Sequence, residues 1–189
     1  MAMKIERLDP ERLSDCDSLV RIYQSAIERS EQKPEAALRA LLRDWRYDVL
    51  IARDVTGVVQ GFSMVFHSET RTFWLLEYMA VAKEARGSGI GAHLFSSAAA
   101  AAAERSPTAP GILEVDVPPV GSASSDDRAR RFRFYERQGC HSLGGIDYIL
   151  PLDTHGAPPP MTLLICDPVG RPPWPLAMVA TWPDALYVG

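Results

Sequence analysis

The order of hydrophobic and polar residues predicts strands and amphipathic helices along most of the chain. Residues 3–9 alternate between apolar and polar side chains, as expected of a short strand with one buried face. Over residues 10–30 apolar side chains recur every three or four positions, which is typical of an amphipathic helix. The same spacing follows Pro34, so we expect a second helix over residues 34–45 with the proline in its first turn.

A different pattern follows this second helix. Residues 47–81 are rich in β-branched and aromatic side chains and are interrupted at DVTG and SET, which predicts three strands in a meander. We place these strands at residues 47–53, 58–67 and 71–81. A long helix is expected over residues 89–105, because this segment contains six consecutive alanines, the strongest helix former.

The next part of the chain continues the alternation of strand and helix. We expect a strand over residues 111–117, a polar loop, a basic helix over residues 126–139 and a further strand over residues 140–152. Gly139 is expected to end the basic helix as its C-cap residue. A pair of adjacent glycines, Gly144 and Gly145, is expected to bend the last of these strands.

The composition changes near residue 152. We therefore place the main domain at residues 1–152 and a proline-rich extension at residues 153–189, with one added strand over residues 161–166 and an irregular tail after it. The extension contains apolar stretches, and a monomer rarely leaves a large apolar patch in water. We expect these stretches to pack on the core of the chain itself, to join the edge of the sheet or to contact a second copy of the chain, and of these we favour a homodimer.

The bulk composition is that of a globular protein and argues against several functions. The 189 residues are 47% hydrophobic and 23% charged, with a formal net charge of −4. Broad nucleic-acid binding depends on a basic field, so we expect no nucleic-acid partner. No run of 18 apolar residues and no apolar signal region occur, so we expect neither a membrane span nor secretion.

The cysteines and histidines predict neither a disulfide framework nor a metal site. Cys16, Cys140 and Cys166 are widely separated, no CxxC pair occurs, and the four histidines do not have metal-ligand spacing. We expect a reduced, cytoplasmic protein without bound metal.

The segment RGSGIG, residues 86–91, is the strongest candidate for a binding site. It lies between a predicted strand and a predicted helix, and the first N–H groups of a helix have no intrahelical partner and carry positive dipole charge. Glycine lets an anion approach the backbone closely, and Arg86 and Lys83 add positive charge. The segment therefore predicts a phosphate site, and a pyrophosphate fits its length.

Two nucleotide motifs compete for this segment. A P-loop needs Gly-Lys-Ser/Thr, which does not occur. Residues 87–92 do satisfy the dinucleotide pattern G-x-G-x-x-A, and Glu114 follows a little over 20 residues later, so an NAD(P)-dependent reductase is an alternative. That fold needs the first glycine directly after a strand and further βαβ units, and the pattern supplies neither.

Residues 86–91 also match R/Q-x-x-G-x-G/A, and here the chain resembles the GNAT superfamily of N-acetyltransferases. LLEYMAV, residues 75–81, is similar to the fourth strand of that family, and FYERQGC, residues 134–140, to its second signature. The resemblance covers about residues 3–152. It implies an α/β fold with a central mixed, mostly antiparallel sheet of about six or seven strands. It also implies helices on both faces and a splay between strands four and five.

The resemblance implies that acetyl-CoA is the co-substrate and that two stretches of backbone bind it. The pantetheine would pair with the fourth strand, much as an added strand does, and the pyrophosphate would lie on the glycine loop. The residues concerned are Met79, Ala80 and Val81 on the strand, and Arg86, Gly87, Ser88, Gly89, Ile90, Gly91 and Ala92 on the loop.

The implied reaction is transfer of the acetyl group to a primary amine by direct attack in a ternary complex. Glu77 is the candidate general base, because an ammonium with a pKa near 10 must lose a proton before it attacks. Glu114 and Asp116 remain alternatives for this role. Tyr135, in the second signature, is the candidate acid for the departing thiolate. The acceptor stays open between polyamine, aminoglycoside, amino acid, peptide N-terminus and protein lysine.

The second signature departs from the family pattern at three positions. Arg128 and Arg131 stand where the family often has asparagine and alanine, and Cys140 replaces the final aromatic residue. These changes allow a second hypothesis, a non-catalytic protein that senses acyl-CoA. Glu77 and Tyr135 argue against it, because a sensor needs neither an acid nor a base.

Overall fold

A computed structural model describes residues 3–117, 126–143, 148–149 and 160–167 of the chain. Within these residues the helices are α1 (Leu13–Ala26), α2 (Glu35–Leu41), α3 (Ile90–Arg105) and α4 (Asp127–Arg137), with short 3-10 turns η1 (Arg29–Glu31) and η2 (Lys83–Ala85). The strands are β1 (Lys4–Arg7), β2 (Tyr47–Arg53), β3 (Val59–His67), β4 (Trp74–Val81), β5 (Gly111–Asp116), β6 (His141–Ser142), β7 (Tyr148–Ile149) and β8 (Pro160–Cys166).

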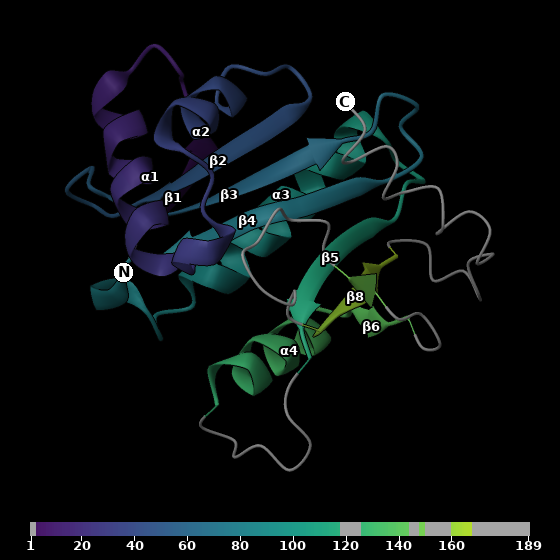
Figure 1. Ribbon diagram of the computed structural model, residues 1–189. Helices are drawn as coiled ribbons and strands as arrows, with labels where there is room; N and C mark the ends of the chain where they lie inside the picture. Colours follow the sequence, from purple (N-terminus) through teal and green to yellow (C-terminus); the bar gives the residue numbers. More distant parts are fainter. Residues whose placement is uncertain (1–2, 118–125, 144–147, 150–159, 168–189) are drawn as a thin grey trace. The chain divides into compact units, whose positions relative to one another are not determined.

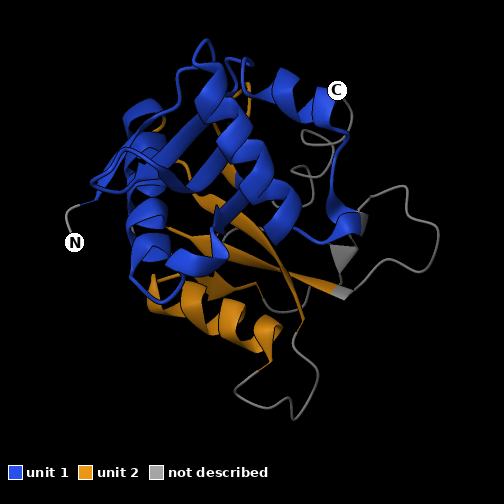
Figure 2. Cartoon of the chain, turned by 90° about the vertical axis from the view of Figure 1, so that its left-hand side faces the viewer, with its two compact units in different colours: residues 1–67, 76–105 blue, residues 68–75, 106–189 orange. Residues whose placement is uncertain are grey.

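The chain forms two compact units, shown in two colours in Figure 2. The first unit comprises Met1–His67 and Leu76–Arg105, and the second comprises Ser68–Leu75 and Ser106–Gly189. Strand β4 contributes its first two residues to the second unit and the rest to the first.

The first unit is built on the strand order β1-β2-β3-β4. β1 pairs antiparallel with β2, and β2 pairs antiparallel with β3. β3 neighbours β4, so the predicted meander of three successive strands is confirmed, with its third strand beginning at Trp74 rather than at residue 71. Helices α1 and α2 lie on one face of these strands and α3 on the other, as Figure 1 shows. Two covered faces explain why β2 and β3 are buried along almost their whole length rather than at alternate positions.

The core under α1 is apolar and aromatic. Tyr23 packs against Phe62 and meets Tyr78 edge to face, with ring centroids 5.0 Å apart in the second pair. The opposite face is packed closely at Gly61, where a Cβ would lie 2.8 Å from the carbonyl oxygen of Ala80 and 3.0 Å from Cδ1 of Leu94. Only glycine therefore lets α3 and β4 approach β3 at this position.

Charged side chains are buried at one end of the first unit. The Asp48 carboxylate accepts a hydrogen bond from Arg7, lies 3.6 Å from Arg105 and contacts Nε2 of the buried His67 at 2.8 Å. Burial raises the pKa of Asp48, but the hydrogen bond to His67 and the charge of Arg7 together bring it below its usual value. A buried carboxylate with this many partners is a structural feature, because each partner offsets part of its desolvation.

The second unit has the strand order β4-β5-β8-β6, with β7 paired to β8. β4 and β5 are parallel and their ladder has two residue pairs, Trp74–Gly111 and Leu75–Ile112, which agrees with the implied splay of the fourth and fifth strands. A Cβ on Gly111 would lie 2.2 Å from the Trp74 ring, so this pairing requires glycine. β5 then pairs antiparallel with β8 along its whole length. The mixed, mostly antiparallel sheet with helices agrees with the expected fold class.

Helix α4 packs on β5, and its ends follow the sequence closely. Asp126 caps its first turn by accepting hydrogen bonds from the N–H groups of Arg128 and Ala129. Gly139 ends it with φ +86°, while its own N–H bonds to the Glu136 carbonyl and that of Cys140 bonds to the Tyr135 carbonyl. The predicted C-cap is therefore confirmed as a Schellman motif.

The strand predicted over residues 140–152 is not continuous, which corrects the sequence-based expectation. β6 and β7 are two residues each, and Leu143 between them donates its N–H to the Leu163 carbonyl at 2.9 Å. The strand predicted over residues 161–166 forms as β8 and lies between β5 and β6 in the strand order. The expected boundary at residue 152 and the tail from residue 168 onward, with its proposed dimer contact, lie outside the described residues.

β8 also brings together two cysteines that are far apart in sequence. His141 is paired with Ile165, which places Cys140 across from Cys166, and the two thiols are hydrogen-bonded. That hydrogen bond, together with burial, raises the pKa of the Cys140 thiol. Cys140 is therefore a packed, protonated side chain.

Candidate functional site

The glycine loop lies where β4 ends and α3 begins, as the sequence predicted. After Val81 the chain makes the 3-10 turn η2 and reaches the first helical residue at Ile90. Gly87 and Gly89 have φ values of +79° and +86°, a conformation that side-chain-bearing residues rarely adopt. These two glycines turn the chain so that it enters α3 with exposed backbone.

The exposed backbone of the loop is suited to an anion. A Cβ on Gly87 would meet nothing within 4 Å, and one on Gly89 would meet only the His93 ring at 4.0 Å, so the space over these residues is open. The first turn of α3 contains no acidic residue. The N–H groups of Ile90, Gly91 and the next residue cannot bond within the helix, and the helix dipole makes this end positive.

Two side chains of the loop donate hydrogen bonds to backbone carbonyls that precede the loop. The Arg86 Nε donates to the Val81 carbonyl at 3.2 Å, and the Ser88 hydroxyl donates to the Ala85 carbonyl at 2.5 Å. These bonds fix the loop while the Arg86 side chain stays exposed. The residues present therefore fit the pyrophosphate of a coenzyme, because both the open N–H groups and the cation lie on one short segment.

The strand residues expected beside the coenzyme lie directly before this loop. Ala80 is buried, and Met79 and Val81 are half-buried. These three residues and the loop belong to the same unit, and residues 82–85, which include the 3-10 turn η2, connect the two predicted coenzyme-binding stretches.

Glu77, the candidate base, has partners at both carboxylate oxygens. The Tyr47 hydroxyl donates to Oε2 at 2.5 Å, and the Lys33 ammonium lies 3.2 Å from Oε1. The Glu77 side chain is 15% exposed, so solvent reaches it. Burial, followed by the charge of Glu77, raises the pKa of Tyr47, which therefore stays a hydrogen-bond donor at any physiological pH.

Sequence reasoning missed Lys33 and Tyr47, because neither lies in a family motif. Tyr47 is the first residue of β2, and Lys33 lies between α1 and α2, 44 positions before Glu77. Tyr78, the neighbour of Glu77, also reaches this segment, since its hydroxyl is 3.4 Å from the Glu31 carbonyl.

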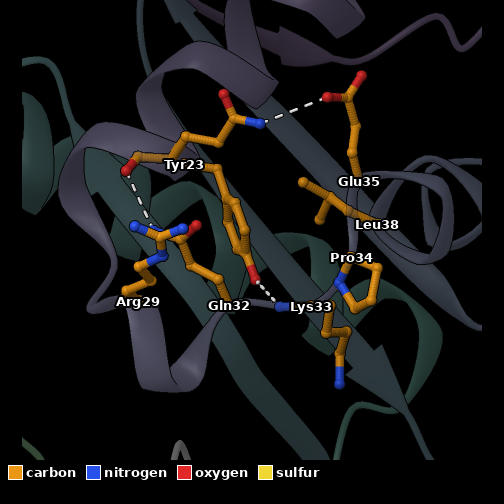
Figure 3. Close-up of a pocket in the computed structure, with 8 residues that line it drawn as sticks. Tyr23, Arg29, Gln32, Lys33, Pro34, Glu35 and Leu38 are labelled. Carbon is orange, nitrogen blue, oxygen red and sulfur yellow. Dashed lines mark hydrogen bonds between the residues drawn. The ribbon is translucent and has the colours of Figure 1, made fainter.

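A cavity of about 310 Å³ opens in the same segment, between α1 and α2. Its lining carries both charges, with Arg29 and Lys33 against Glu35, and includes the Tyr23 ring. In Figure 3 the Lys33 side chain extends away from the other lining residues, consistent with its ion pair to Glu77. The cavity therefore does not have the acidic lining that would select a small polycation.

The alternative bases on β5 have other contacts. Asp116 forms an ion pair with Arg131 at 3.0 Å, and its side chain is 14% exposed. This pair gives Arg131 a structural partner at a position where the family pattern has alanine. Glu114 is half-buried on the same strand.

Tyr135, the candidate acid, is buried on α4 in the second unit, with its ring 5.1 Å from that of Phe134. Burial raises the pKa of Tyr135 to about 12. A phenol with this pKa keeps its proton at neutral pH, and it can donate a hydrogen bond to a sulfur or return a proton to a strongly basic thiolate.

Two further properties of the described residues bear on function. They contain no group of three or more histidine, cysteine or carboxylate side chains placed to hold a metal ion. Of the helices in the described part of the chain, none has the length and apolarity that a membrane crossing requires.

One known protein family has a model that matches the part of the chain containing β4 and the glycine loop. A family model described as the acetyltransferase (GNAT) domain matches residues 45–139, which is half of the chain and includes β4, the glycine loop, α3 and α4. No curated protein matches the chain significantly.

Solved structures of acetyltransferases share the fold. An aminoglycoside 6′-N-acetyltransferase in complex with coenzyme A has a TM-score of 0.71 at 18% identity, over 90% of this chain and 99% of that one. The ribosomal-protein-S18-alanine N-acetyltransferase of Escherichia coli has a TM-score of 0.68 at 16% identity, over 88% and 94% of the two chains. A variant of the spermidine N-acetyltransferase of Vibrio cholerae has a TM-score of 0.63 at 13% identity, over 87% and 93%.

Proposed function

The chain belongs to the GNAT acetyltransferase family and is an acetyl-CoA-dependent acyltransferase, and we propose that it acetylates a primary amine by direct attack in a ternary complex. The observation that carries this proposal is the anion site at the start of α3. Its open glycine backbone lies in the loop that connects α3 to the strand that the family uses for its coenzyme.

The coenzyme-binding residues are those of β4 and the loop. The N–H groups of residues 87–92 and the Arg86 guanidinium hold the pyrophosphate, while the backbone of Met79–Val81 pairs with the pantetheine. An N–H group of that strand polarises the thioester carbonyl. When bound, acetyl-CoA supplies an acetyl group that is already activated as a thioester.

Glu77 takes the proton that the acceptor ammonium must lose. Its carboxylate is partly exposed and fixed in position by Tyr47, which leaves free lone pairs on both oxygens for the acceptor or for a bridging water. Because Lys33 occupies one oxygen, an acceptor ammonium at this carboxylate competes with the Lys33 ammonium.

Tyr135 is the proposed donor to the leaving thiolate. Its raised pKa of about 12 means that it is fully protonated at neutral pH, which a donor requires. Asp116 is the less suitable base, because its partner Arg131 carries a guanidinium that does not lose its proton, whereas the Lys33 ammonium beside Glu77 can.

The solved relatives support a primary amine as the acceptor, because the acceptors in their names differ in every other respect. The relatives named above act on an aminoglycoside, on an alanine of a ribosomal protein and on spermidine. The mixed charges of the cavity between α1 and α2 favour an acceptor that carries a carboxylate or amide beside its amine over a bare polycation.

The test measures thiol release from acetyl-CoA over a panel of amines. The panel compares spermidine and an aminoglycoside with amino-acid amides and short peptides, and calorimetry measures acetyl-CoA binding in parallel. Amine-dependent release supports the proposal. Binding without release from any amine would instead support the acyl-CoA sensor, and a rise in melting temperature with NADH but not acetyl-CoA would contradict both.

A further inference from the structure

Lys33 places a primary amine of the chain itself against the proposed base. Its Nζ lies 3.2 Å from Oε1 of Glu77, and Glu77 is two residues before the strand backbone proposed to hold the thioester. Two residues of a strand span about 7 Å. An acceptor amine that gives its proton directly to Glu77 would occupy this same position, next to the carboxylate.

The position of Lys33 is fixed by several contacts. Its backbone N–H donates to the Tyr23 hydroxyl at 2.8 Å, and Pro34 follows it, so the backbone at this point has little freedom. The side chain is 34% exposed and extends away from the other residues that line the cavity between α1 and α2, as Figure 3 shows. Lys33 is therefore both ordered at its base and open to a small group at its tip.

The use of lysine at this position is unusual for this chain. The sequence contains three lysines, Lys4, Lys33 and Lys83, among 20 basic residues, so the other 17 are arginines. Arginines form nearly all the other ion pairs, including those to Asp48 and Asp116. A guanidinium does not lose its proton in a protein, whereas an ammonium beside a carboxylate can become a nucleophilic amine.

We propose that Lys33 is an intramolecular acetylation site, modified by the protein's own acetyltransferase centre. The inference rests on the proposed function. Acetylation would convert the Lys33 ammonium into a neutral amide and so remove the cation that occupies Glu77. The carboxylate would then be open to the external acceptor.

The reaction balances with acetyl-CoA as the only co-reactant. The Lys33 ammonium gives one proton to Glu77, which passes it to solvent, and the neutral Nζ forms a bond with the acetyl carbon. The thioester C–S bond breaks, and its electron pair leaves on the coenzyme sulfur. Nζ loses a second proton to become an amide, and the thiolate takes up one proton. The products are N-acetyl-Lys33, the free thiol of coenzyme A and one proton in solution.

The experiment follows acetylation of each lysine by mass spectrometry after addition of acetyl-CoA to the full chain. Trypsin cuts after Arg29 and Arg39 but not before Pro34, so the peptide 30–39 reports on Lys33 alone. Lys4, whose side chain is 73% exposed, measures the uncatalysed background. We expect Lys33 to react about 100-fold faster than Lys4, since a general base typically contributes 10²–10⁴-fold.

Three controls define the mechanism. Glu77→Gln removes the base and should reduce Lys33 acetylation to the background rate. Gly89→Asp should do the same by blocking the coenzyme, whereas Lys33→Arg should remove the modification from the 30–39 peptide and keep a positive charge. An intramolecular reaction also predicts that the rate constant for Lys33 does not change when the protein is diluted 20-fold.

The outcomes separate the inference from the proposed function. Equal acetylation of Lys4 and Lys33, or acetylation of Lys33 that persists in Gly89→Asp, would overturn the inference. So would an unmodified Lys33 in protein that binds acetyl-CoA and transfers acetyl groups to added amines, and in that case the proposed function would stand. Failure to bind acetyl-CoA at all would contradict the proposed function and the inference together.

Discussion

Two exposed glycine turns of the first unit differ in what their N–H groups contact. In the turn between β2 and β3, Gly57 has φ +84°, and the Asp54 carboxylate accepts from the N–H groups of Thr56 and Val58 at 2.9 and 3.1 Å. In the loop before α3, Gly89 has φ +86° and the first helical turn carries no acidic residue. The two glycines have similar backbone conformations. The turns differ because the Asp54 carboxylate accepts hydrogen bonds from the first, whereas no acidic side chain lies in the helical turn that follows the second.

The N–H groups of the first turn therefore bind a carboxylate of the chain itself, whereas those at the start of α3 are available to a ligand. Hydrogen bonds from the Thr56 and Gln60 side chains, with smaller contributions from the backbone N–H groups of Val58 and Thr56, lower the pKa of Asp54 to about 2. The donors at the start of α3 add the helix dipole to the same chemistry. The loop is therefore built to hold a negative group that the sequence does not supply there.

The largest expected effect is loss of acetyl-CoA binding in Gly89→Asp. The new carboxylate would occupy the position of the pyrophosphate and repel it, so binding measured by calorimetry should fall below detection. Gly57→Asp is the matched control, because it places the same residue at a similar positive φ with open space around it. Equal acetyl-CoA affinity in the two variants would show that the pyrophosphate does not bind at this loop.

A smaller effect is expected from Glu77→Gln, which should lower turnover about 10³-fold while acetyl-CoA affinity changes little. Glutamine keeps the hydrogen bond from Tyr47 but cannot take a proton. Steady-state rates across pH should also lose the acid limb that reports a base. A variant with wild-type turnover would reduce Glu77 to a structural partner of Lys33.

Tyr135→Phe should lower turnover on the order of 10²-fold and leave the coenzyme affinity nearly unchanged. The ring stays buried in the variant, so the change removes the hydroxyl and little packing. Single-turnover kinetics compared with calorimetry separates the two effects. Loss of affinity and turnover in equal measure would indicate a binding role instead.

The smallest effect concerns the filled turn and its dependence on pH. The folded-state pKa of Asp54 is about 2, below its usual value of 3.8, so its carboxylate contributes stability above about pH 4 that is lost as pH falls toward 2. Urea unfolding should therefore show Asp54→Asn less stable than wild type at pH 7, with a difference that shrinks at pH 3. A difference that does not change with pH would mean that the hydrogen bonds do not depend on the charge.

The sequence predicted most of the first unit because local signals agree there with the tertiary structure. The β2–β3 meander and α3 lie within one or two residues of their expected bounds, since β-branched strands, the DVTG turn and the alanine run all favour the same elements. The glycine loop was predictable for the same reason. Its function depends on backbone, and glycines reveal where backbone is exposed.

The sequence could not predict contacts between residues far apart along the chain. Lys33 and Tyr47 converge on Glu77 only through the pairing of strands and the path between α1 and α2. The pairing of β8 with β5 could not be predicted either, because an apolar segment such as MTLLIC does not indicate which strand it pairs with.

The most direct test of pyrophosphate binding at residues 87–92 is an assigned amide spectrum of the protein, recorded by NMR during a titration with coenzyme A. We predict that the largest shifts fall on the N–H groups of residues 87–92, as they form hydrogen bonds to the pyrophosphate. The N–H groups of Thr56 and Val58, already bonded to Asp54, should hardly move. Saturable binding that leaves residues 87–92 unshifted would contradict the assignment of this loop.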